Sequence, residues 1–216
     1  MNPHVKRHRQ FYIRTGNLHF LVGRYLFRVH QHFFTAESEY FRDLLETTVP
    51  GGYTAKGMDD ANAIILDDVL VEEFECFLAV FYEPYYTLDS PDEWLLILEL
   101  ASHWRFGEVK KTAVRALNKL GVPEVDRIVA FQNHGVSNSY ILPLLAAVVA
   151  REEPLTAEEG EKLGMRTAIH IAQLRETARS NTRRARGEPA LEDRRVDANV
   201  QGIVQETFNI PTSAPT

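Results

Sequence analysis

Residues 17–46 read NLHFLVGRYLFRVHQHFFTAESEYFRDLLE. Apolar residues alternate with their neighbours over residues 18–22 and again over residues 25–29, as in two strands that each bury one face. Gly23 and Arg24 separate these two runs, and a glycine in the first position suits a two-residue hairpin turn of type II′. This stretch therefore predicts a β-hairpin.

The spacing of the apolar residues becomes helical after the hairpin. Ser38 can cap a helix on which Phe41 belongs to the apolar face. This order of elements resembles the opening of a BTB/POZ domain: a hairpin, a histidine, a short helix, and a serine before an aromatic residue. The residues that fill the family's positions are Phe27, His30, Phe33 or Phe34, Ser38 and Phe41.

The BTB/POZ resemblance covers residues 11–120. In its second half, the run Asp-Val-x-x-Glu-Glu-Phe at 68–74, followed by Trp94 and an Ala-x-x-Trp turn at 101–104, resembles the variant common in fungal proteins. Residues 63–66 predict a further strand, and residues 74–81 repeat apolar side chains at the spacing of an amphipathic helix. The Ser-Pro-Asp-Glu run at 90–93 contains the serine and glutamate of a capping box, and Trp94 after it is expected in the core with Phe41. The resemblance implies an α+β fold, in which helices flank a small sheet of three to five strands.

Two further regions follow. Residues 122–178 contain three runs of helical spacing, and we expect a three-helix extension that looks like a shortened BACK-type extension. Within it, Thr156 and Glu159 form a capping box at the start of a long helix. Residues 180–216 are predicted to be a flexible tail, in which residues 191–209 carry apolar side chains at the spacing of a short amphipathic helix.

Charge is unevenly distributed along the chain. The net charge is −6, yet six Lys and Arg residues and five of the eight histidines precede the first acidic residue, Glu37. Residues 1–10 are thus predicted to be a flexible basic N-terminus, a feature of some nucleic-acid-binding chains. We favour solvated surface charge over nucleic-acid contact, because Arg24 and Arg28 fall at the predicted turn and on the outer face of a predicted strand.

Composition excludes several classes of protein. The longest apolar run, residues 140–150, is too short to cross a bilayer, and no apolar segment follows the basic N-terminus as it does in a signal peptide. Cys76 is the only cysteine, so no intrachain disulfide can form. These features predict an intracellular protein, cytoplasmic or nuclear, that does not contact a membrane.

The sequence contains no motif for catalysis. It lacks a glycine-rich phosphate loop, an H-E-x-x-H pair and a G-x-S-x-G turn. The pairs His30 with His32 and His4 with His8 do not supply the four ligands of a zinc site, and we expect His30 to bond backbone groups at a strand–helix corner. Cys76 is predicted to be a small core residue and not a nucleophile. We therefore expect no enzyme activity, no cofactor and no metal.

The BTB/POZ resemblance implies a protein-interaction module. BTB relatives often form homodimers by exchanging a first strand and packing their first helices together. The candidate interface here consists of a short strand and two side chains of the first helix: Phe11, Tyr12, Ile13, Phe33 and Phe34. We expect a homodimer that recruits an unidentified partner protein, with a monomer covered by its C-terminal helices as the alternative.

Two other roles within the family are alternatives. Some BTB proteins are substrate adaptors of cullin-type ubiquitin ligases, and those often carry an apolar-x-Glu motif before the third strand. The nearest match here is Met58, Asp59 and Asp60, with aspartate in place of glutamate. Other BTB proteins regulate transcription, a role that the basic N-terminus would serve, although the chain lacks the Cys and His set of a zinc finger.

Overall fold

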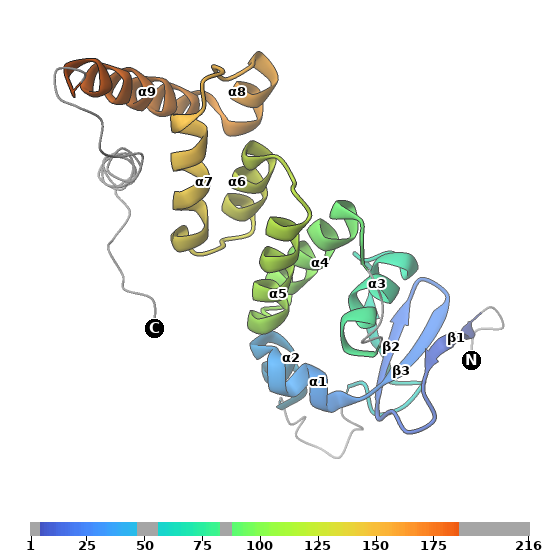
Figure 1. Cartoon of the computed structure of the whole chain (residues 1–216). Coiled ribbons are helices and arrows are strands. Elements are labelled where there is room, and N and C mark those ends of the chain that lie inside the picture. Colours follow the sequence, from blue (N-terminus) through green and yellow to red (C-terminus); the bar gives the residue numbers. More distant parts are fainter. Residues whose placement is uncertain (1–4, 47–55, 83–87, 186–216) are drawn as a thin grey trace. The chain divides into compact units, whose positions relative to one another are not determined.

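The computed structural model of the chain describes residues 5–46, 56–82 and 88–185. The chain divides into two units between Leu120 and Gly121. Within the described residues, the first unit contains four strands and five helices, and the second contains four helices (Figure 1). The segment 191–209, with its helical spacing of apolar residues, and most of the predicted tail lie outside the described residues.

The first unit is built on a mixed sheet with the strand order β1-β3-β2-β4. The predicted hairpin is present as β2 (Leu18–Val22) and β3 (Tyr25–Val29), which pair antiparallel. On one side of this hairpin, β1 (Lys6–Tyr12) runs parallel to β3 (Figure 1). On the other side, β4 (Ile64–Leu66) runs parallel to β2. The predicted α+β class with a small sheet is confirmed.

The first strand is longer than predicted. The sequence indicated a strand only at Phe11, Tyr12 and Ile13 after a flexible lead-in, whereas residues 6–10 of that lead-in are part of β1. Lysine and arginine have low strand propensity, so their presence in this run argued against a strand. An edge strand tolerates them because its outer side faces solvent, where charge prevents unwanted pairing.

Two glycines shape the loops beside the hairpin. Gly23 adopts a φ of +56° at the hairpin turn, a region that residues with a side chain rarely occupy. Gly57 precedes β4, and a Cβ atom on it would lie 2.6 Å from Leu18 Cδ1. Its carbonyl accepts the His19 N–H at 2.8 Å, so the loop from Lys56 to β4 packs directly against β2.

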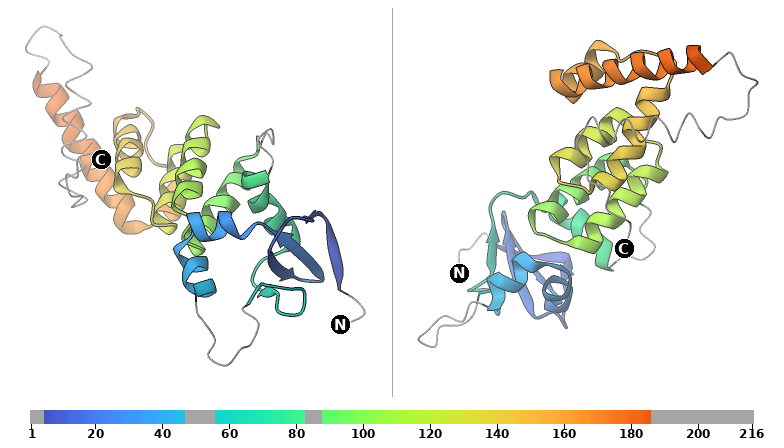
Figure 2. Two further views of the ribbon diagram at one scale, coloured as in Figure 1. Left: turned by 90° about the horizontal axis from the view of Figure 1, so that it is seen from below. Right: turned by 90° about the vertical axis from the view of Figure 1, so that its left-hand side faces the viewer.

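The described residues of the first unit also form five helices. Their bounds are α1 (Gln31–Glu37), α2 (Glu39–Glu46), α3 (Val71–Tyr82), α4 (Pro91–His103) and α5 (Gly107–Lys119). The helices α4 and α5 lie side by side in Figure 1 and in both views of Figure 2, and α3 packs against α4. This arrangement leaves one face of α3 between β1 and α4.

An aromatic core joins the sheet to the helices. Trp104, at the corner between α4 and α5, is 1% exposed, and the rings of Phe41, Phe74 and Phe77 pack around it at 5.0–5.9 Å between centroids. The predicted burial of Phe41 is confirmed. The predicted burial of Trp94 is wrong: this residue is only half-buried, because it lies near the beginning of α4, where its indole N–H donates to the Leu88 carbonyl at 2.8 Å.

The second unit consists of α6 (Glu124–Asn133), α7 (Asn138–Ala150), α8 (Ala157–Leu163) and α9 (Met165–Ala185). The sequence predicted three helices over residues 122–178, the last a long one. That long helix is instead divided at Gly164, which has a φ of +78° and a ψ of 152°. Because this backbone conformation is open to glycine and strained for other residues, Gly164 ends α8 and redirects the chain into α9.

The predicted capping boxes have different outcomes. At the start of α8, Thr156 Oγ1 accepts the Glu159 N–H at 3.2 Å and the Glu159 carboxylate accepts the Thr156 N–H at 2.9 Å, so this box is confirmed. Arg151 also donates to the Glu159 carboxylate, at 2.8 Å to Oε1. The predicted box at the start of α4 is absent, because the side chain of Ser90 makes no capping hydrogen bond there.

Candidate functional site

The predicted interface strand is held in the chain's own sheet. Phe11 is 3% exposed and belongs to the core, while Tyr12 and Ile13 are half-buried. The Ile13 N–H donates to the Arg28 carbonyl at 2.8 Å, which continues the contact with β3 just past the end of β1. These residues are therefore not an exposed apolar patch on the structure described.

A buried histidine, which sequence reasoning placed in a flexible lead-in, anchors β1. The ring of His8 stacks on Phe27 with 4.4 Å between centroids, and its Nδ1 accepts the Phe11 N–H at 3.0 Å. Because Nδ1 accepts, the proton of the neutral ring lies on Nε2, which donates to the carboxylate of Glu75 on α3. His8 thus connects β1 to both β3 and α3.

A second polar cluster joins β1 to the loop before β4. The Asp60 carboxylate accepts hydrogen bonds from Tyr12 Oη at 2.9 Å, His19 Nδ1 at 2.8 Å and Arg7 at 3.2 Å. Partial burial acts to raise the pKa of Asp60, but these hydrogen bonds outweigh it, so the pKa lies below its ordinary value. We call these four residues the Asp60 cluster.

The candidate cullin-contact residues are largely committed to contacts within the chain. Asp59 Oδ1 accepts the N–H groups of Ala61 and Asn62, both at 2.9 Å, which fixes the conformation of the loop. Asp60 is the acceptor at the centre of the Asp60 cluster. Met58, with 52% of its surface exposed, is the member of the three that faces solvent.

The two phenylalanines of α1 have different environments. Phe34 is fully buried against Phe20 and Phe41, with 5.0 Å between ring centroids in each case. The expectation that both side chains form a surface of the first helix is therefore wrong for Phe34. Phe33 is half-buried and stacks on Phe81 at 5.2 Å, so it retains some surface for a partner.

The other family positions lie at corners of the core. Phe27 is fully buried, and His30 links two segments through its ring nitrogens. His30 Nδ1 lies 3.1 Å from the Tyr82 hydroxyl and Nε2 lies 3.0 Å from the Thr15 hydroxyl. The prediction that these nitrogens bond backbone groups is wrong, since both partners are side-chain hydroxyls.

Ser38 caps α2 as predicted and also makes a contact that the sequence did not reveal. Its Oγ accepts the Phe41 N–H at 3.0 Å and donates to the Trp104 carbonyl at 2.5 Å. Ser38 therefore connects the beginning of α2 to the corner between α4 and α5.

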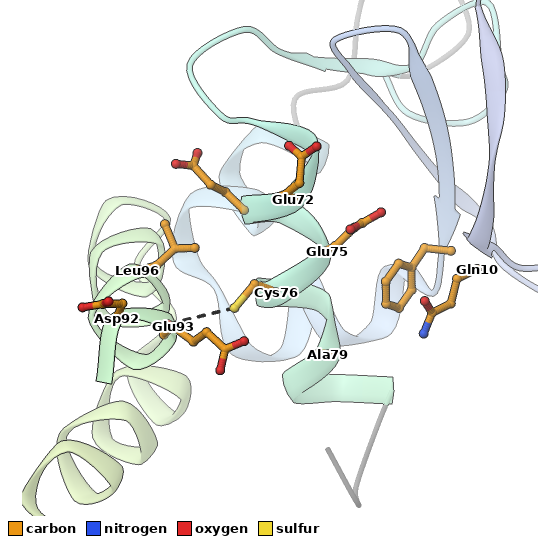
Figure 3. A pocket seen from close by; sticks show the side chains of 10 residues that line it. Gln10, Glu72, Glu75, Cys76, Ala79, Asp92, Glu93 and Leu96 are labelled. Atoms are coloured by element: carbon orange, nitrogen blue, oxygen red, sulfur yellow. Dashed lines mark hydrogen bonds between the residues drawn. The ribbon is translucent and has the colours of Figure 1, made fainter. Parts of the chain in front are cut away.

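A groove crosses the outward face of α3 between β1 and the beginning of α4 (Figure 3). Its volume is 460 Å³, within the range of cavities that accept small molecules or peptide side chains. The apolar part of its lining comes from Phe11, Cys76, Ala79 and Leu96. The acidic part comes from Glu72, Glu73, Glu75, Asp92 and Glu93.

The pKa of the Cys76 thiol reflects the negative charge around this groove. Burial raises the pKa of Cys76, and the negative charge of Glu93 raises it further, to about 11. A thiol with this pKa is protonated at neutral pH and is a poor nucleophile there. The prediction that Cys76 is a core residue needs correction, because the side chain is half-buried and lines the groove.

Within the described ranges, no group of three or more His, Cys, Asp and Glu side chains is placed to hold a metal ion. In the same part of the chain, none of the helices has the length and apolar character needed to span a bilayer. The expected absence of metal and cofactor stays a prediction.

Comparison with known proteins assigns the first unit. Residues 14–120 match the family model of the BTB/POZ domain. These residues are a BTB/POZ domain. BTB/POZ domains are generally protein-interaction modules and generally not enzymes. No curated protein matches the chain, and the fungal type and the BACK-like nature of the second unit stay predictions.

Sequence reasoning missed the groove of the BTB domain because each of its parts has an ordinary explanation. Acidic residues in the first turn of a helix complement the helix dipole, and this interpretation suits both the 72–75 and the 92–93 runs. Only the packing of α3 against α4, with β1 alongside, brings these carboxylates to one groove. One signal in the sequence was charge: the runs 72–75 and 92–93, near the starts of two helices, together contain five acidic residues and no basic residue.

Proposed function

We propose that this BTB protein is a self-associating interaction scaffold that recruits a partner protein. The observation that supports self-association is the way β1 is held. It is an edge strand that pairs only with β3 in the sheet, and its buried His8 joins it to Phe27 of β3 and Glu75 of α3. A second copy offers β1 the same β3 strand and the same Glu75 carboxylate. Two chains can therefore exchange their β1 strands with twofold symmetry, and each strand keeps the contacts that it makes in one chain.

The surface of α1 supports the same proposal. Phe33 is half-buried, and the neighbouring side chains of His32 and Ala36 are exposed. A small residue such as Ala36 allows two helices to approach closely, whereas a long charged side chain at the same position would prevent it. We therefore propose that α1 packs against α1 of a second copy.

Light scattering of the full chain tests self-association. We expect a mass of twice 24.7 kDa at tens of micromolar. The Ala36→Arg variant should have the mass of one chain, because an exposed arginine costs little in the monomer but separates the two copies of α1. The Ala172→Arg variant, the same change at an exposed position of α9, should remain dimeric.

A parent chain that is monomeric at this concentration would rule out self-association. A chain starting at Gly16 separates the two contributions, because it lacks β1 and retains α1. If this shortened chain is folded by circular dichroism and still dimeric, the α1 contact suffices and strand exchange is not required for the dimer.

The alternative roles have less support from the structure. For a cullin adaptor, the acidic residue of the candidate loop would have to be available, but Asp60 is engaged by Tyr12, His19 and Arg7. For a nucleic-acid-associated regulator, the basic strand would have to present its charges to phosphate. One of these charges, that of Arg7, is compensated within the chain, because the guanidinium lies over the Tyr12 ring at 4.6 Å and pairs with Asp60.

A further inference from the structure

We propose that the groove on α3 binds a cationic peptide of a partner protein, with one apolar side chain in the groove and flanking lysine or arginine side chains at its acidic rim. This inference rests on the recruiting role proposed above but not on self-association. All five carboxylates belong to α3 and α4, so the rim is the same in a monomer and in a dimer.

The first argument is the availability of the carboxylates. Glu73 accepts the Leu70 N–H and Glu75 pairs with His8, so these two are engaged within the domain. For Glu72, Asp92 and Glu93, no side-chain hydrogen bond or ion pair occurs within the described residues. Three carboxylates at the edge of one groove, without a basic residue among its lining, attract a cation from outside.

The second argument is the shape and polarity of the groove. A surface cluster of carboxylates alone would be flat and wet, whereas here a hollow of 460 Å³ with carbon-rich walls lies among them. Ala79 leaves room in the wall nearest the end of α3, and Leu96 with Cys76 supplies apolar contact on the α4 side (Figure 3). A single aliphatic side chain inserted there would exclude water and strengthen the neighbouring ion pairs.

The third argument comes from the occupants that the groove does not suit. A divalent cation needs several ligands converging on one point, and the described residues contain no such group. A phosphate or a nucleic acid would be repelled by the five carboxylates. The Cys76 thiol also indicates a negative potential in the groove, since the charge of Glu93 contributes to its raised pKa. A peptide with lysine or arginine beside an aliphatic residue satisfies both the charge and the walls.

Fluorescence anisotropy with a labelled Gly-Arg-Lys-Leu-Arg-Gly peptide, titrated with the full chain at low salt, tests the proposal. We expect saturable binding that weakens as salt is raised. Replacing the leucine of the peptide by serine should weaken binding, and replacing its three cationic residues by glutamate should abolish it. Equal affinity of the leucine and serine peptides would overturn the apolar part of the proposal.

Matched variants locate the binding. Glu72→Gln combined with Glu93→Gln removes two charges from the rim without changing side-chain volume, and should weaken binding by about threefold to tenfold. Asp67→Asn combined with Glu99→Gln removes two exposed charges outside the groove and should change affinity by less than about twofold. Equal losses in the two double variants would show non-specific attraction to an acidic chain and would refute the groove as the site.

The single cysteine gives an independent readout at the groove. Saturating peptide should slow the alkylation of Cys76 by N-ethylmaleimide, followed by mass spectrometry at alkaline pH. Peptide binding that leaves the alkylation rate unchanged would place the peptide elsewhere. Light scattering of the same samples separates the proposals: a monomer that binds the peptide refutes self-association alone, and a dimer that does not bind it refutes this inference alone.

Discussion

Replacing Ser38 by alanine tests whether a single hydroxyl joins two parts of the BTB core. The change removes one buried oxygen and leaves the backbone bonds of Ser38 in place. It deletes the cap on the Phe41 N–H, a loss of about 1 kcal/mol. It also leaves the buried Trp104 carbonyl without its Ser38 donor, at a cost of about 1–3 kcal/mol. The free energy of unfolding of the first unit should therefore fall by about 2–4 kcal/mol.

Urea unfolding followed by tryptophan fluorescence measures this loss, because both tryptophans, Trp94 and Trp104, belong to the first unit. Ser90→Ala is the matched control: it is the same substitution at the beginning of another helix of this unit, where the serine makes no capping hydrogen bond. The free energy of unfolding of this control should lie within about 0.5 kcal/mol of that of the parent. If Ser38→Ala unfolds at the same urea midpoint as Ser90→Ala, the hydroxyl does not join α2 to the α4–α5 corner.

Three further predictions follow from single side chains. Trp104→Ala should lower the free energy of unfolding in urea by about 3–5 kcal/mol, because it empties the centre of the aromatic core. Trp94→Ala should lower it by less than half as much, because this side chain is only half-buried. Equal losses in the two variants would contradict the burial described. The alkylation rate of Cys76 should rise with pH up to about 11, and the Glu93→Gln variant should shift that pH profile to lower pH. An unshifted profile would show that the Glu93 charge does not raise the pKa of Cys76. The hydrogen bonds from Arg151 and Thr156 lower the pKa of Glu159 to about 2, so its contribution to stability is present above about pH 4.5 and is lost as the pH falls towards 2. In circular dichroism, Glu159→Gln should flatten this acid dependence of the second unit's helices, and an unchanged profile would refute the assignment.

The parts of the fold that the sequence predicted are those in which local pattern and burial agree. The hairpin follows from strict alternation around Gly23, and the beginning of α2 follows from a serine three residues before a phenylalanine. In both cases the residues that carry the pattern are also the ones that the core buries, such as Phe20 and Phe41. Periodicity and tertiary structure then give the same answer.

The parts that the sequence did not predict depend on contacts between distant segments. His8 is buried because Phe27 and Glu75, 19 and 67 residues away, surround its ring, and nothing within its own run of basic residues indicates this. Trp94 and Trp104 have similar apolar neighbours along α4, yet only the corner before α5 buries its indole. Local spacing cannot rank two such residues, because burial depends on which helix packs against which face.

The anchoring of β1 connects the two surfaces proposed for this protein. Phe11 is part of both the core beneath β1 and the apolar wall of the groove, and Glu75 at the groove is the carboxylate that receives His8. The acidic rim belongs to α3 and α4, so its charge does not depend on which copy supplies β1. The apolar wall does depend on it, since a displaced β1 would remove Phe11 and leave Glu75 without His8. A β1 strand from a second copy would restore both contacts, so an exchanged dimer would have the same groove lining as the single chain described here.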